Sequence, residues 1–97
     1  MPTYIVLMNF TEKGIKAVRD TAKRTDAAKA MAKKAGLAMK DAHWTLGAYD
    51  GVIVYEAPDD ETMTAFLLTV AEEGFVKTHT LRAFSEPEIK KIIGRMP

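Results

Sequence analysis

Two adjacent side chains near the middle of the chain, Tyr49 and Asp50, are the best candidates for chemistry in this sequence. A phenol and a carboxylate held on a short turn could bind a polar ligand or relay a proton, and His43 lies close enough in the chain to join them in proton transfer. The same residues have a structural alternative. Asp50 can accept hydrogen bonds from turn amides, and Tyr49 can cover the rim of the core.

The two histidines, His43 and His79, do not predict a metal site. In the sheet predicted below they fall on opposite edge strands, about 14 Å apart across three strand spacings. The chain has no cysteine, and no spaced carboxylate or third histidine completes a ligand set. We therefore expect no metal and no cofactor, with His43 partly exposed beside Trp44 and His79 on the surface.

Neither a nucleophilic hydrolase nor a phosphate-binding loop fits the sequence. Ser85 is the only serine and lies where a helix N-cap is expected, so a Ser-His-Asp mechanism has no spare nucleophile. Gly47 and Gly51 belong to a predicted hairpin, whereas the glycines of a phosphate cradle precede a helix. Both classes of activity are therefore excluded.

A polar stripe on the last predicted strand adds candidates for ligand binding. Thr78, Thr80 and Arg82 share one face of that strand, and a cation facing an apolar interior requires a carboxylate. Asp50, Glu56 or a bound ligand could supply it, and a salt bridge between subunits is the alternative. The candidate ligand-binding residues are Trp44, Tyr49, Asp50, Thr78, Thr80 and Arg82.

Four segments have the composition and spacing of β-strands. They are Thr3–Phe10, Leu37–Leu46, Gly51–Glu56 and Val76–Phe84. The second and third form a hairpin with two candidate turns, Gly47-Ala48 in a type II′ turn or Asp50-Gly51 in a type I′ turn.

Three segments have helical spacing. A helix over Glu12–Ala35 would span about 36 Å, longer than the preceding strand at about 27 Å, so we expect a break or overhang near Thr21–Asp26. Thr25-Asp26 can recap a second helical piece there. A second helix begins at the acidic residues after Pro58 and ends at Gly74. Ser85-Glu-Pro-Glu is a capping box that starts a short amphipathic helix at the end of the chain.

The order of these elements, β-α-β-β-α-β with an added C-terminal helix, predicts an α+β fold of the ferredoxin-like type. Right-handed crossovers place the first and third strands at the centre and the other two at the edges. Both main helices then cover one face of the sheet. The other face carries aliphatic side chains and must meet a partner, which predicts a homodimer whose two sheets form an α/β-barrel.

Four segments resemble the GYD domain family, which is named for its Gly-x-Tyr-Asp turn. They are Pro2-Thr-Tyr-Ile-Val-Leu, Trp44-Thr-Leu-Gly-Ala-Tyr-Asp, Glu56-Ala-Pro-Asp-Asp-Glu and Thr80-Leu-Arg-Ala-Phe. The resemblance covers essentially all of residues 1–97 and implies one ferredoxin-like domain in a dimeric α/β-barrel. Gly51 departs from the β-branched residue expected there, which would loosen the start of the third strand.

The bulk composition limits the partners. A chain of 97 residues with 47% hydrophobic content and a net charge of +1 suits one domain and has no field that would attract nucleic acid. The lysine-rich first helix is interrupted by Asp20 and has no interleaved aromatic residue, so it fits a solvated face. No apolar run is long enough for a membrane span and the start lacks the features of a signal peptide, so we expect a cytoplasmic protein.

Three hypotheses about function follow. The first is a non-catalytic homodimer, or a higher oligomer, that binds a small and perhaps anionic organic molecule in the cleft between sheet and helices. The second is a cofactor-independent enzyme resembling small monooxygenases or isomerases of the same barrel type, with His43, Tyr49 and Asp50 in proton transfer. The third is a purely structural unit of a larger assembly. Under this hypothesis Trp44 packs in the core or in an interface between subunits.

Overall fold

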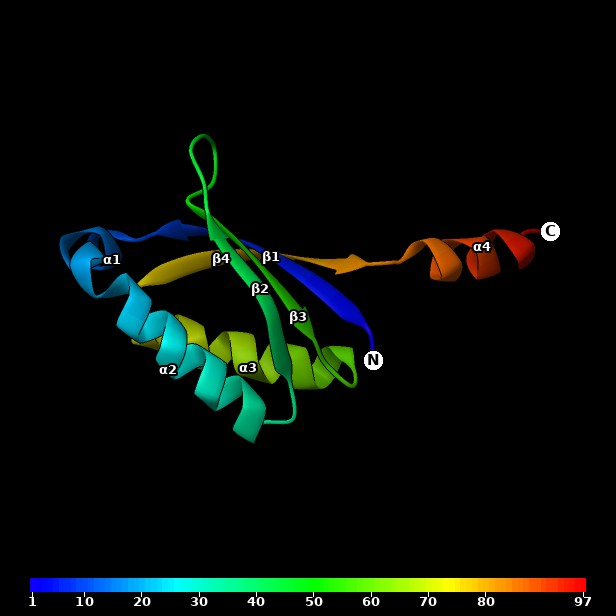
Figure 1. The fold of residues 1–97 in the computed structure, drawn as a ribbon, viewed down its shortest axis with the longest axis horizontal. Helices are drawn as coiled ribbons and strands as arrows, with labels where there is room; N and C mark the ends of the chain where they lie inside the picture. The colour runs from blue at the N-terminus through cyan, green and yellow to red at the C-terminus, as the bar shows by residue number, and fades with distance from the viewer.

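A four-stranded antiparallel sheet with helices packed on one side forms the body of the protein (Figure 1). The computed structural model describes residues 1–97, and the strand order is β2-β3-β1-β4. In chain order the elements are β1 (Thr3–Phe10), α1 (Glu12–Lys16), the 3-10 helix η1 (Val18–Asp20), α2 (Thr21–Lys34), β2 (Ala38–Trp44), β3 (Gly51–Glu56), α3 (Asp60–Glu73), β4 (Val76–Ala83) and α4 (Glu86–Gly94). The predicted ferredoxin-like α+β fold with its added C-terminal helix is confirmed, including the two central strands.

The core lies between the sheet and the helices, where β1 begins. Alternate residues of β1, starting with Tyr4 and Val6, are buried on the helix side. The aromatic rings of Tyr55 and Phe66 meet edge to face at 5.2 Å. The buried cluster consists of Tyr4, Val6, Ala32, Leu37, Tyr55, Ala57, Met63 and Phe66. These residues come from β1, β3, the end of α2 and the start of α3, so the core is concentrated at one end of the sheet.

The first helical segment is broken, as expected, but not where the sequence placed the break. α1 stops at Lys16 and the chain passes through η1 before α2 begins at Thr21. The predicted recapping at Thr25–Asp26 was wrong, because α2 continues through both residues and the Thr25 hydroxyl donates to the Thr21 carbonyl at 2.9 Å. Tertiary contacts of α1 determine the position of the break.

Those contacts join α1 to the segment between α3 and β4. The Thr11 amide donates to the Phe75 carbonyl at 3.1 Å, and the Thr11 hydroxyl donates to the Gly74 carbonyl at 2.5 Å. The same hydroxyl caps α1 by accepting from the Gly14 amide at 3.1 Å. A Cβ atom on Gly14 would lie 1.9 Å from the Phe75 carbonyl oxygen. Only glycine allows α1 to approach the start of β4 this closely.

The hairpin between β2 and β3 has a longer loop than either predicted turn. Thr45 donates to the Asp50 carbonyl at 3.0 Å, and the intervening residues include Gly47 at φ +118°. The type I′ turn at Asp50-Gly51 was wrong, since Gly51 does not have positive φ and is the first residue of β3. A Cβ atom on Gly51 would lie 3.0 Å from Met8 Sδ and 3.2 Å from the His43 carbonyl oxygen. Gly51 therefore leaves room for the Met8 side chain of β1 and for the backbone of β2. β3 begins at Gly51, which pairs in register with both neighbouring strands.

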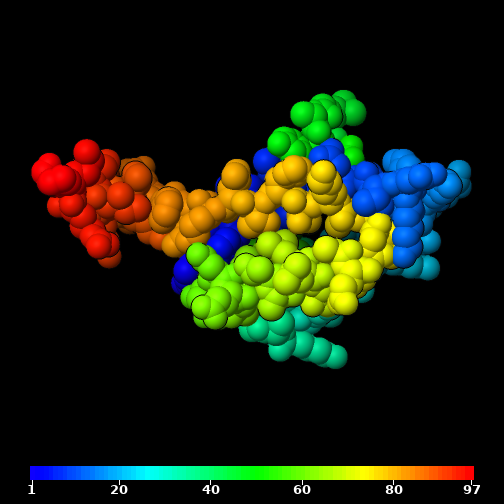
Figure 2. Space-filling model, turned by 180° about the vertical axis from the view of Figure 1, so that it is seen from behind, coloured from blue at the N-terminus to red at the C-terminus, as the bar shows by residue number.

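The last helix, α4, projects away from the body (Figures 1 and 2). It contributes to the 51 Å length of a molecule only 18 Å thick. Its predicted capping box is present, with Ser85 Oγ accepting from the Glu88 amide and the Glu88 carboxylate accepting from the Ser85 amide. No residue of α4 is buried. None of the helices has the length and apolar character needed to cross a membrane.

Candidate functional site

The far end of the helix–sheet interface, where β1 ends, contains a cleft. Its volume is about 80 Å³, and 14 of its 21 lining residues are hydrophobic, so it has an apolar interior. Met8 and Gly51 line it from the sheet, Ala28 from α2 and Val70 from α3. The small side chain of Ala28 leaves part of this space unfilled.

Three of the sequence-predicted residues lie on the cleft wall, namely His43, Trp44 and Thr78. Trp44 pairs with Gly51 in the β2–β3 ladder, on the helix side of the sheet, and is half exposed. The His43 side chain alternates to the other side of β2, where its Nε2 lies 3.1 Å from Asp41 Oδ1. The cleft therefore has Trp44 at its rim, while the His43 imidazole points away from it.

Asp50 and Tyr49 do not line this cleft. The Asp50 carboxylate accepts from the Phe10 amide at 2.9 Å, and the Asp50 amide donates to the Met8 carbonyl at 2.8 Å. The Tyr49 ring packs edge-on against His79 with 5.8 Å between ring centroids. Asp50 thus ties the hairpin loop to the end of β1, and the three proton-transfer candidates are not brought together around the cleft.

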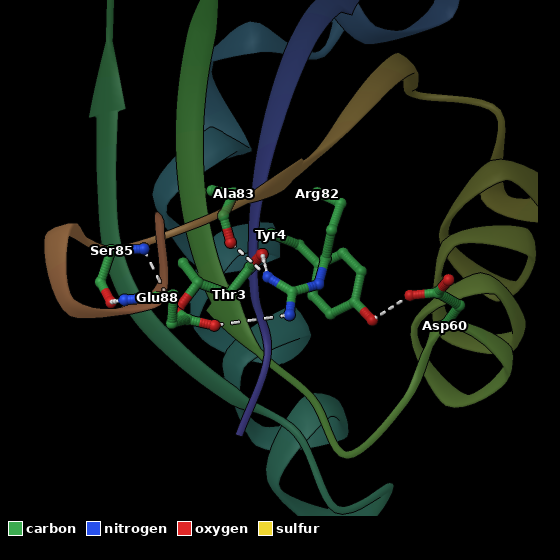
Figure 3. Close-up of polar contacts among 7 residues, drawn as sticks. All are labelled: Thr3, Tyr4, Asp60, Arg82, Ala83, Ser85 and Glu88. Atoms are coloured by element: carbon green, nitrogen blue, oxygen red, sulfur yellow. Dashed lines mark hydrogen bonds and ion pairs between the residues drawn. The ribbon is translucent and has the colours of Figure 1, made fainter. Parts of the chain in front are cut away.

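Arg82 and Thr80 lie on β4 and also outside the cleft wall. Arg82 forms an ion pair with Glu88 of α4 at 3.6 Å and donates to the carbonyls of Thr3 and Ala83 (Figure 3). Its guanidinium also lies over the Phe84 ring, 4.6 Å from the ring centroid. The carboxylate partner is therefore Glu88, which the sequence analysis did not name. The charge of Arg82 is compensated within the chain and does not require a ligand.

Beside Arg82, Tyr4 joins β1 to the first residue of α3. Its hydroxyl donates to Asp60 Oδ1 at 2.5 Å (Figure 3). Burial, together with this bond to a carboxylate, raises the pKa of Tyr4 to about 12. Burial alone raises the pKa of Tyr55 to about 12. Neither phenol can act as a base near neutral pH, so both are structural.

Arg24 is the cleft residue that the sequence analysis missed. Its Nη1 donates to the Ala17 carbonyl at 2.9 Å and its Nη2 to the Thr21 hydroxyl at 3.3 Å, and the guanidinium lies 4.4 Å from the centroid of the Phe75 ring. No carboxylate lies within 4 Å of it. The sequence could have indicated its position, because Arg24 lies four residues before Ala28. This spacing places both side chains on the side of α2 that faces the sheet.

The opposite face of the sheet is uncovered. The register places five aliphatic side chains on it, those of Ile5, Leu7, Val52, Val54 and Leu81, and we call this surface the open sheet face. Leu81 is 52% exposed. His43 and His79 sit at opposite ends of the row that contains Val52 and Leu7. The bare face predicted from the order of elements is present.

Comparison with known proteins agrees with this fold and these motifs. The family model described as "GYD domain" matches residues 4–93. A protein of Thermus thermophilus described as "Glutamine synthetase and cystathionine beta-lyase binding protein" is 34% identical over 84 residues, which cover 86% of this chain and 88% of that protein. On both grounds, this chain belongs to the GYD domain family.

Proposed function

We propose that this protein is a non-catalytic homodimeric binding protein that attaches to another protein through α4. The observation that carries the proposal is the position of α4, which stands clear of the body (Figure 2) and has no buried residue. Ile89, Ile92 and Ile93 have the i, i+3, i+4 spacing of a helix that docks in a groove, and they are 38–57% exposed. The Arg82–Glu88 ion pair and the capping box hold the helix in place at its first turn.

The open sheet face supports the dimer. A contiguous aliphatic surface of this kind is unfavourable in water, and a second copy offers the same surface for burial. Pairing the two faces would enclose Leu7, Val54 and Leu81 of each copy and form the barrel. α4 projects past the end of β4, so it can remain free in this dimer.

The dimer is tested by Leu7→Lys, which places a charge at the centre of the open sheet face. Analytical ultracentrifugation at micromolar concentration should give a dimer for the natural protein and a folded monomer for the variant. Leu68→Lys is the matched control, because Leu68 is 64% exposed on α3 and should leave the dimer unchanged. A natural protein that sediments as a monomer would refute the pairing.

Protein binding is tested with two purified enzymes of the host, its glutamine synthetase and its cystathionine β-lyase, since the Thermus relative is described as binding these. Ile92→Asp should weaken binding at least tenfold, because it places a charge on the docking side of α4. Ile15→Asp, a change of the same kind on exposed α1, is the control. Equal binding by both variants, or no binding of either enzyme to the natural protein, would count against α4 as the attachment site.

The cleft favours a second candidate function, the binding of a small organic molecule between sheet and helices. An apolar space with an arginine on its wall is an unusual use of core volume, since filling it would stabilise the fold. Its 80 Å³ lies below the roughly 300 Å³ at which pockets for drug-sized ligands begin, so a small ligand is required. The cofactor-independent enzyme has no comparable support, because Tyr49 and Asp50 lie outside this space.

A further inference from the structure

We propose that the cleft binds a short-chain organic monocarboxylate, with Arg24 as the residue that receives the carboxylate. The proposal rests on the small-molecule candidate above and names the ligand's chemical class. It is independent of α4 and of the open sheet face, since Arg24 and the cleft lie on the helix side of the sheet.

The hydrogen bonds of Arg24 leave it able to bind an anion. A guanidinium has five N–H donors, and two of them are used, on the neutral oxygens of Ala17 and Thr21. The charge itself has no protein carboxylate within 4 Å, although the side chain is only partly exposed. The same bonds hold the guanidinium over Phe75, so its position is set before a ligand arrives.

Arg82 provides the contrast within the same chain. It is similarly half-buried and stacks on an aromatic ring, but it has Glu88 as its carboxylate partner. Arg24 has the stacked ring without the carboxylate. A ligand carboxylate would complete at Arg24 the pairing that Glu88 completes at Arg82, with the two parallel hydrogen bonds that arginine favours.

The surrounding charges favour a ligand with one negative charge. Lys13 Nζ lies 4.3 Å from the centroid of the same Phe75 ring and adds positive potential at this end of the cleft. Glu73 also lines the cleft, and Asp20 lines a neighbouring hollow that Arg24 also borders. These two acids would repel a dianion or a phosphate more strongly than a monocarboxylate.

The cleft interior determines the rest of the ligand. Met8, Val70 and the ring of Trp44 offer aliphatic and aromatic contacts, and the volume of about 80 Å³ admits only a short chain. Sugars and nucleotides would place hydroxyl groups against these apolar walls without partners. A ligand with a carboxylate and a short aliphatic tail would pair with Arg24 through the carboxylate and contact the apolar walls through the tail.

Trp44 gives a direct measurement, because it is the only tryptophan and lies on the cleft wall. The full-length protein is titrated with pentanoate, pentan-1-ol and pentylamine while Trp44 fluorescence is recorded at neutral pH. Pentanoate should produce a saturable change with an affinity at least tenfold above that of the alcohol, and the amine should bind most weakly. Ala28→Leu, which fills the cleft, should abolish the change for all three probes.

The role of Arg24 is then tested by substitution. Arg24→Met should reduce pentanoate affinity at least tenfold, to the level of pentan-1-ol, while leaving the alcohol unaffected. Arg24→Lys should retain part of the preference for the anion. Lys23→Met removes the same charge from the exposed neighbouring position and should change nothing.

Two results would overturn the proposal in distinguishable ways. If the natural protein bound acid and alcohol with equal affinity, and Ala28→Leu blocked both, the carboxylate proposal would be wrong while small-molecule binding in the cleft would stand. If no probe gave a saturable change, both the carboxylate proposal and small-molecule binding in the cleft would be wrong. The comparison of acid with alcohol uses only the natural protein, so it stands even where Arg24→Met fails to fold.

Discussion

The two ends of the helix–sheet interface are built on different principles. At the end where β1 begins, Met63 is almost wholly buried, and the rings of Tyr55 and Phe66 meet edge to face at the boundary with the cleft. At the end where β1 stops, Ala28 of α2 faces the sheet and a cleft remains. The same two helices therefore cover a filled region and an unfilled one.

The charged groups follow the same division. Arg82 belongs to the packed end and is neutralised by Glu88, as the Tyr4 hydroxyl is bound to Asp60 (Figure 3). Arg24 belongs to the cleft end and has no such partner. Stability and binding capacity are thus separated along one interface, and substitutions can test whether that separation is real.

The largest effect is expected at Gly14, where α1 packs against the backbone of Phe75. Gly14→Ala places a Cβ atom 1.9 Å from the Phe75 carbonyl oxygen, and a backbone atom cannot rotate away. α1 would have to move and lose its Thr11 hydrogen bonds to Gly74 and Phe75. We expect a loss of about 3 to 4 kcal/mol in the free energy of unfolding, measured by urea denaturation.

Gly94→Ala is the control for this substitution. Nothing lies within 4 Å of a Cβ atom on Gly94, which is the last residue of α4. The free energy of unfolding should change by less than about 1 kcal/mol. The change should tend toward stabilisation, because alanine has fewer backbone conformations than glycine in the unfolded chain. A Gly14→Ala protein as stable as the Gly94→Ala protein would show that α1 is loosely attached.

The second effect compares the two ends along a single helix. Met63 and Val70 lie seven residues apart on the same side of α3, the first in the packed end and the second on the cleft wall. Met63→Ala should cost about 2 to 3 kcal/mol, because it opens a new cavity in a filled core. Val70→Ala should cost about 1 kcal/mol, because it enlarges a space that already exists. Equal losses by thermal or urea unfolding would remove the distinction between the two ends.

Local chemistry made the helix ends and the strands predictable. The Asp59 N-cap of α3, the left-handed Gly74 and the Ser85 capping box each depend on residues within four positions of one another. The apolar, β-branched and aromatic composition of residues 3–10 likewise identified β1 as a central strand. With four strands in order, the right-handed crossover rule was enough to place them correctly.

The cleft half depended on contacts between distant segments. The position of the break after α1 is set by Thr11 binding Phe75, 64 positions along the chain, and Asp50 reaches back to the Phe10 amide. The partner of Arg82 depends on the direction in which α4 leaves β4. Arg24 was not singled out, because a single position on a helix of alanines and lysines carries little signal of facing inward.

The last comparison concerns alkaline pH and depends on the two buried tyrosines, Tyr4 and Tyr55. The pKa values of Tyr4 and Tyr55 are raised to about 12 in the folded protein, from 10.0 for an unperturbed tyrosine. Above pH 10 the unfolded chain loses protons that the folded chain keeps, so the stability present below pH 10 should decline as the pH rises toward 12.

Tyr4→Phe should remove one of these two contributions and flatten the decline. At neutral pH it should cost only about 1 kcal/mol, because Asp60 is exposed and water replaces the lost hydrogen bond. Val70→Ala, at the cleft end, should keep the full pH dependence. Urea unfolding between pH 9 and 12 makes the comparison, and ultraviolet absorbance of the phenolate follows the titration. If Val70→Ala flattened the decline as much as Tyr4→Phe, the two ends would be coupled, and the cleft could not be emptied or filled without disturbing the packed core.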